Sequence, residues 1–354
     1  MAMSAHHIAG HSRTVVFAPR IAELFDKYRG QDLFRLEPDT IGIAGADLMD
    51  AVLAARPARP DERPTFKPVH HRPVSRADAS TFMQAVTADV RAALKTPPDT
   101  DIDLTGSWPQ RAHDYVRDLV FGHEDFRFRV LVDRRLELTP KLTWSAVTSG
   151  AALIGRTGSA RPLSKLAEQV FRADNFRDRR YAMYLYRRVA APVCFTVAAL
   201  VTSAVWLASP LPPETSNRNI LLETLRLLPP SWNLLRLKGP EYAAVDDRIG
   251  VGDDILLLPL LSQRDPRLWE APDEFRPDRW DELDPDTHPG YLPFGHASER
   301  CWGRHLVLPL AERILDIARR DGLAVDPDQV VGRVELDGLL EIADLRVRAK
   351  PVAT

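Results

Sequence analysis

Two cysteines occur in the 354-residue chain, and one of them lies where a thiolate could do chemistry. Cys301 belongs to the segment YLPFGHASERCWGRH (291–305) and directly precedes an apolar stretch with helical spacing. The N-terminus of a helix lowers the pKa of a thiol and favours the thiolate, the form that attacks carbon or binds a metal. For Cys301 alone, a buried structural cysteine is the simpler interpretation. The choice between a structural and a reactive cysteine therefore depends on residues elsewhere.

Two upstream segments carry charged residues that could support such a loop. LLETLRLLPPSWNLLR (221–236) places Glu223 and Arg226 three residues apart on a predicted helix, where the two side chains can pair. SQRDPRLWEAPDEFRPDRW (262–280) is a proline-rich aromatic stretch that contains Arg279 near its end. Each segment alone says little about function, whereas the order and spacing of all three segments are more specific.

Together the three segments resemble the cytochrome P450 family over residues from about 221 to 320. By this resemblance Cys301 is the axial thiolate ligand of a b-type haem iron, which pushes electron density onto the metal and favours O–O cleavage. The residues that match the haem-binding loop are Phe294, Gly295, Cys301 and Gly303. Glu223 and Arg226 match the family's ExxR pair, and Arg279 matches the arginine that joins them in a structural network behind the loop.

The resemblance also implies cations for the haem propionates. Arg236 lies where the family often places such an arginine, with a solvated surface arginine as the equal alternative. Arg300 is expected to make a propionate contact in place of its acidic neighbour Glu299. His71 and Arg76 are weaker candidates for the same role.

One segment could be read as a membrane span. Residues 189–213 carry no charge, and about 20 apolar residues suffice to cross a bilayer. A helix buried on all sides of a large helical protein has the same composition. The resemblance favours the second interpretation, with this run as the long helix that crosses over the haem, and predicts a soluble protein without a membrane partner.

Two registers of this helix are possible, and neither supplies the acid that the family usually places before an alcohol. In the first, Thr202 is the alcohol and lies 21 positions before Glu223, and Val201 replaces the acid. In the second, which is favoured, Ala191 and Pro192 lie over the iron. A proline there is similar to the peroxide-using branch of the family, although that branch has an arginine where this chain has Ala191.

Hydrophobic periodicity predicts helices over 79–95, 110–121 and 164–176. Two strands are predicted within 241–261, a long irregular stretch over 265–293, and short strands over 330–349. The expected fold is therefore mainly α with small β-sheets, the cytochrome P450 fold, in a single domain that spans residues 1–354.

Composition limits the partners and the compartment. The formal net charge of −2 gives no argument for nucleic acid as a partner. Two cysteines cannot form a disulfide framework, and no signal peptide is visible at the N-terminus, so a cytoplasmic location is expected.

Three functional hypotheses follow. The first is a haem-thiolate monooxygenase or oxidase that acts on a small organic molecule, is reduced by a ferredoxin or another redox partner, and belongs to secondary metabolism. The second is a peroxide-driven or otherwise non-standard haem-thiolate enzyme. The third is a non-catalytic relative that serves as a partner protein for other biosynthetic enzymes.

Overall fold

The computed structural model describes residues 8, 13–55, 69, 72–97, 101–122, 126–134, 141–153, 164–296 and 299–349. Helices dominate, and the strands within these ranges form four small sheets, as the sequence predicts. The helices of the first half are α1 (Pro19–Tyr28), α2 (Ala46–Ala54), α3 (Arg76–Lys95), α4 (Gln110–Phe121), α5 (Phe126–Leu131), α7 (Lys141–Leu153) and α8 (Lys165–Phe171). Those of the second half are α9 (Phe176–Ala208), α10 (Asn217–Leu227), α11 (Pro240–Ala243), α12 (Pro259–Ser262), the 3-10 helix η2 (Pro277–Asp281) and α13 (Arg304–Arg320).

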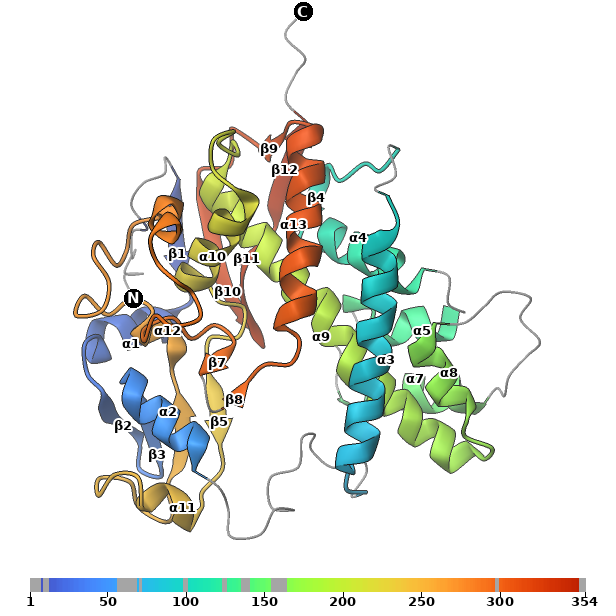
Figure 1. Cartoon of the computed structure of the whole chain (residues 1–354), viewed down its shortest axis with the longest axis horizontal. Coiled ribbons are helices and arrows are strands. Elements are labelled where there is room, and N and C mark those ends of the chain that lie inside the picture. Colours follow the sequence, from blue (N-terminus) through green and yellow to red (C-terminus); the bar gives the residue numbers. More distant parts are fainter. Residues whose placement is uncertain are drawn as a thin grey trace, which may run out of the picture.

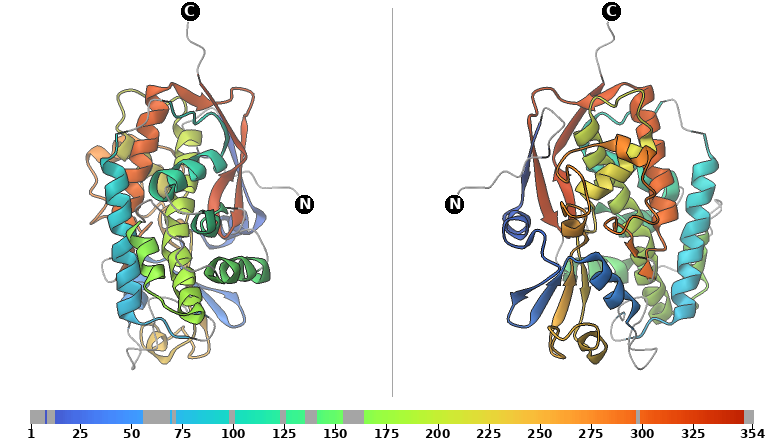
Figure 2. Two further views of the ribbon diagram at one scale, coloured as in Figure 1. Left: turned by 90° about the vertical axis from the view of Figure 1, so that its right-hand side faces the viewer. Right: turned by 60° about the vertical axis from the view of Figure 1, so that its left-hand side comes forward.

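The sheets lie mainly on one side of the helices (Figures 1 and 2). The largest has the order β2 (Leu33–Glu37), β3 (Thr40–Ile43), β6 (Asp254–Leu257) and β5 (Leu234–Arg236). A second joins β1 (Thr14–Phe17) to β10 (Val331–Asp337) and β11 (Leu339–Ala343), and a third joins β4 (Gly106–Trp108), β12 (Leu345–Ala349) and β9 (Leu323–Val325). The fourth is a short hairpin of β7 (Gly295–His296) and β8 (Glu299–Arg300) in the Cys301 loop.

The long helix α9 runs through the centre of the helical half (Figure 1). Its N-terminus is capped by Asn175, whose side-chain oxygen accepts a hydrogen bond from the backbone N–H of Asp178 at 2.9 Å. Its 33 residues are long and apolar enough to cross a bilayer, yet 89% of the most apolar window is buried inside the protein. The expectation of a buried central helix is therefore confirmed.

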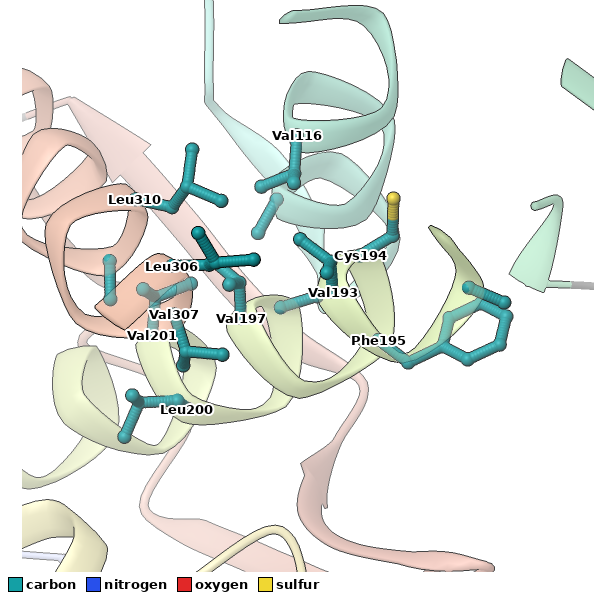
Figure 3. Packing of buried hydrophobic residues seen from close by; sticks show 14 of the residues in the cluster. Val116, Val193, Cys194, Phe195, Val197, Leu200, Val201, Leu306, Val307 and Leu310 are labelled. Atoms are coloured by element: carbon teal, nitrogen blue, oxygen red, sulfur yellow. The ribbon is translucent and has the colours of Figure 1, made fainter. Parts of the chain in front are cut away.

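Apolar contacts fix α13 and α4 against α9. Val197 and Val201 of α9 lie next to Leu306 and Val307 of α13, while Val193 and Cys194 lie toward Val116 of α4 (Figure 3). Because α13 starts three residues after Cys301, its packing on α9 ties the position of the thiol loop to the central helix.

The predicted helix over 79–95 is confirmed as α3, while the predicted helix over 164–176 is shorter and ends at Phe171. The prediction of two strands within 241–261 is wrong: only β6 forms there, between the one-turn helices α11 and α12. Pro240 and Pro259 occupy the first positions of those helices, where the fixed φ of proline favours helix initiation. The strands expected over 330–349 are confirmed as β10, β11 and β12.

Candidate functional site

A buried ionic network forms the base of the candidate site. Glu223 and Arg226 are fully buried on α10, and Arg226 donates two hydrogen bonds to the Glu223 carboxylate, at 3.0 and 2.7 Å. Arg279 Nε donates to the same carboxylate at 3.2 Å, and the indole N–H of Trp280 donates to it at 3.0 Å. The structure thus brings together the three charged residues that the sequence singles out, and both carboxylate oxygens accept several donors.

The network is fastened to the segment that leads to the thiol loop. Arg226 Nη1 donates to the carbonyl of Gln263 at 2.9 Å, and the side-chain amide oxygen of Gln263 accepts the backbone N–H of Leu292 at 3.0 Å. The buried hydroxyl of Tyr291 donates to the carbonyl of Leu222 at 3.0 Å. Since Leu292 precedes Phe294 by two residues, α10 determines where the loop begins.

The loop around Cys301 holds its thiol with backbone groups. The Cys301 N–H donates to the Phe294 carbonyl at 2.7 Å, closing a turn in which Gly295 adopts a φ of 80° that favours glycine. Desolvation by the surrounding protein raises the pKa of the Cys301 thiol, while the backbone N–H groups of Gly303 and Arg304 hydrogen-bond the sulfur and lower it. The side chain is nevertheless solvent-accessible, unlike that of the other cysteine, Cys194, which is fully buried.

One stripe of α9 is left uncovered. From Tyr181 to Ala208 every residue of α9 is buried except Arg188, Pro192 and Thr196. Successive members are four residues apart, so that the three side chains lie on one face of the helix. This face, in the middle of an otherwise buried helix, is thus accessible to solvent or to a ligand.

The two registers considered for α9 place different residues on this stripe. Pro192 is exposed within it, and Thr196 one turn later donates its hydroxyl hydrogen bond to the Pro192 carbonyl at 2.7 Å. Thr202 is fully buried, and its hydroxyl donates to the Ala198 carbonyl at 2.7 Å. The structure therefore places Pro192 on the uncovered face and Thr202 within the packed core.

The propionate candidates take different positions. Arg236 is half-buried on β5, with Nη1 donating to the Leu235 carbonyl at 3.3 Å. Arg300 instead engages Asp286, with distances of 2.9 Å to the carboxylate and 2.8 Å to the backbone carbonyl. Arg76 is exposed at the first residue of α3, and His71 lies outside the described residues.

Three residues of the site are not singled out by the sequence motifs. Trp280 and Gln263 contribute hydrogen bonds to the network, and both belong to the segment that contains Arg279. Thr196 follows Pro192 by one helical turn, and this i,i+4 spacing is the signal that could have identified it from the favoured register.

Comparison with known proteins agrees with this geometry. The family model described as Cytochrome P450 matches residues 218–309. Cyclooctatin synthase of Streptomyces melanosporofaciens is 35% identical over 95 residues, which are 26% of this chain and 21% of that protein. Cyclooctat-9-en-7-ol 5-monooxygenase of the same organism is 34% identical over 110 residues, 30% of this chain and 24% of that protein. The chain thus matches only about a fifth to a quarter of the length of these curated relatives.

The fold agrees over a much larger part of the chain. The solved structure of the post-tailoring hydroxylase HmtN, involved in himastatin biosynthesis, covers 94% of this chain and aligns over 97% of its own length, with a TM-score of 0.56 and 16% identity. CYP175A1 from Thermus thermophillus covers 93% of this chain and aligns over 95% of its own length, with a TM-score of 0.53 and 17% identity. The motif residues gathered around one thiol, the match of residues 218–309 to the family model and this shared structure identify the cytochrome P450 fold in this chain.

Proposed function

We propose that the chain, as one domain over residues 1–354, is a haem-thiolate monooxygenase that acts on a small organic molecule. The observation that carries the proposal is the combination of an accessible thiol, bonded by two backbone N–H groups, with an uncovered stripe on the central helix. The names of the matched relatives, a synthase and a monooxygenase from Streptomyces, support a role in secondary metabolism.

The residues present fit a haem. Cys301 would hold the iron as thiolate, and the N–H groups of Gly303 and Arg304 would stabilise the negative sulfur. Pro192 and Thr196 belong to an uncovered face that a flat macrocycle and a substrate could cover. Arg236 and Arg300 are the candidates to pair with the haem propionates, and Arg300 also contacts Asp286.

When bound, the haem supplies the activation of oxygen, and the protein supplies position and protons. The Glu223 network keeps the Cys301 loop in place, because each buried charge of the network has a fixed partner. Each hydroxyl donates to the carbonyl four residues earlier in α9, but Thr196 lies on the uncovered stripe, where it could hold and pass a proton, while Thr202 is fully buried. We assign the register with Pro192 over the iron for this reason.

A peroxide-driven reaction is the second candidate. Residues 189–213 contain no carboxylate, so the acid that usually feeds protons to bound oxygen is missing from α9. Peroxide brings both oxygen atoms already reduced and needs no electron-transfer partner. If hydrogen peroxide alone drives turnover as well as a ferredoxin system does, this candidate is preferred, whereas dependence on a ferredoxin or another redox partner supports the monooxygenase.

The test is the absorption spectrum of the purified protein, reduced and exposed to carbon monoxide. We expect the spectrum of a thiolate-ligated haem in the wild type and its complete loss in Cys301→Ala. Cys194→Ala is the matched control, because it removes the other cysteine from the core of α9 and should leave the spectrum unchanged. A wild-type protein that carries no haem after expression in haem-sufficient cells would contradict the proposal and favour the non-catalytic partner protein. Recovery without detergent would agree with a cytoplasmic location.

A further inference from the structure

An unusual histidine lies on α4, on the side that packs against α9. His113 is fully buried, and neither of its ring nitrogens has a hydrogen-bond partner within the described part of the chain. Its ring stacks on that of Phe195 of α9, with ring centroids 5.1 Å apart and planes inclined by 20°. A buried polar group without a partner costs about 1–3 kcal/mol, so its presence calls for an explanation.

The surroundings of His113 link it to the protein surface. Asp114 Oδ1 lies 3.7 Å from His113 Nδ1, and the Asp114 side chain is about one-third exposed. Burial acts to raise the pKa of the Asp114 carboxyl, but contacts with His113, Gln110 and Arg117 outweigh it, so that the pKa lies below its usual value. Asp114 therefore remains a carboxylate at neutral pH, beside the imidazole and in contact with solvent.

Other charged groups near this contact are already engaged. Arg117 pairs with Asp114 at 2.8 Å, and on α5 Arg129 pairs with Asp118 of α4. On α9, Cys194 is neutral because burial raises the pKa of its thiol. The facing strand β4 has the sequence GSW and brings no titratable group, and the buried Asp89 on α3 accepts two hydrogen bonds from the N-terminus of α8.

The contact with Phe195 connects His113 to the uncovered stripe of α9. Phe195 directly precedes Thr196, the alcohol on the uncovered stripe, and it is itself slightly accessible to solvent. No acid is present on α9 near this point, whereas His113, with Asp114 beside it, stacks on the Phe195 ring. The pair thus brings a titratable group next to the stretch of helix that lacks one.

We propose that His113, with Asp114 as its surface-side partner, supplies protons to the Thr196 end of the pocket past the ring of Phe195. This inference rests on the proposed function and adds the proton source to it. In this role His113 is a relay residue rather than one that touches the substrate, and Phe195 is the gate, since its ring must move before water can reach the imidazole.

The proton transfer balances at the imidazole. A proton from solvent adds at Nδ1, which lies 3.7 Å from Oδ1 of Asp114. The proton on Nε2 then leaves through intervening water toward the Thr196 hydroxyl, and the ring becomes neutral again. A rotation of the ring restores the starting tautomer, so each proton delivered is replaced by one from solvent.

The test uses haem-loaded, reduced protein with carbon monoxide, because the C–O stretching frequency responds to charge and hydrogen-bond donors in the pocket. The frequency is measured at about pH 5 and about pH 8, which bracket the ordinary titration range of histidine. We expect it to differ between the two pH values in the wild type. In His113→Phe, which keeps an aromatic ring against Phe195 but removes both nitrogens, the difference should vanish.

His288→Phe is the matched control. His288 also stacks on an aromatic ring, that of Trp269 at 4.0 Å, but it lies in the segment behind the thiol loop rather than against α9. This variant should keep the pH-dependent difference of the wild type. A difference that persists in His113→Phe, or that vanishes in both variants alike, would overturn the proposal.

Asp114→Asn provides a second test at a partly exposed position, should His113→Phe fail to fold. Removing the carboxylate takes away the surface-side partner of His113, so the pH-dependent transition in stretching frequency should weaken. An unchanged transition would contradict the role of Asp114. A protein that binds no haem gives no carbon monoxide complex at all, which separates failure of the proposed function from failure of this inference.

Discussion

The two sides of the candidate pocket are built on different physical principles. On the thiol side, specific hydrogen bonds hold the buried charges: the Glu223 carboxylate accepts from Arg226, Arg279 and Trp280. On the α9 side, hardly any polar contact defines the site, and the stripe is recognised only because its residues are not covered. The P450 family model matches residues 218–309 and leaves α9 outside. Specific polar partners therefore hold the thiol side in place, whereas the α9 side is defined by the shape of one long helix.

The largest effect is expected from breaking the thiol-side network. Glu223→Gln leaves the fully buried Arg226 without its anion, which should lower the free energy of unfolding by about 3–5 kcal/mol in urea denaturation and impair haem retention. Glu312→Gln is the control, since Glu312 pairs with Arg218 at 3.3 Å on the surface and should contribute less than about 1 kcal/mol. Equal losses of unfolding free energy in the two variants would show that the network contributes no more to stability than a surface ion pair does.

The α9 side should respond in turnover rather than in stability. Thr196→Ala removes the hydroxyl on the stripe and should lower turnover by about 10²-fold, the loss typical of a proton-transfer group, with more reducing equivalents released as hydrogen peroxide. Thr202→Ala removes a hydroxyl inside the packed core and should reduce turnover by less than that. A larger loss of turnover in Thr202→Ala than in Thr196→Ala would instead support the register in which Thr202 lies over the iron.

Two prolines within helices allow a direct comparison of the two sides. Pro192 in α9 and Pro309 in α13 each lack the N–H of a helical hydrogen bond, so replacing either with alanine should raise the free energy of unfolding by about 1–3 kcal/mol. Pro192→Ala should also change the C–O stretching frequency of the carbon monoxide complex, because Pro192 lies on the uncovered stripe. An equal spectral change in Pro309→Ala would contradict this assignment.

The smallest effect concerns a single neutral hydrogen bond on the thiol side. Tyr291→Phe removes the bond to the Leu222 carbonyl and should cost about 1 kcal/mol of unfolding free energy. Tyr28→Phe is the control, because the hydroxyl of Tyr28 makes a longer, exposed contact of 3.4 Å with the Arg35 carbonyl. Thermal unfolding of the two variants under identical conditions would distinguish them, and a larger shift for Tyr28→Phe would contradict the assignment.

The contrast between the thiol side and the α9 side also explains which features the sequence could predict. The pairing of Glu223 and Arg226 was predictable from their spacing, and the part of Arg279 in it followed from the family resemblance. The terminal strands were predictable from periodicity, and the central helix was predictable from its uncharged apolar run. The side of α9 that remains uncovered was not, since a helix that is apolar all round carries no mark of its open face. The position of Arg300 depends on a distant partner, Asp286, which no local pattern reveals.

The sheet that joins the two ends of the described chain has a consequence for biosynthesis. Strand β1 pairs in parallel with β10, with Thr14 beside Val331 and Phe17 beside Val334. Strand β1 therefore cannot find this neighbour until more than three hundred further residues have been made. During that interval its unpaired edge is open to wrong partners, and contacts of such large sequence separation form slowly. Yield of the folded protein should thus depend on chaperones and on the speed of translation more than its final stability would suggest.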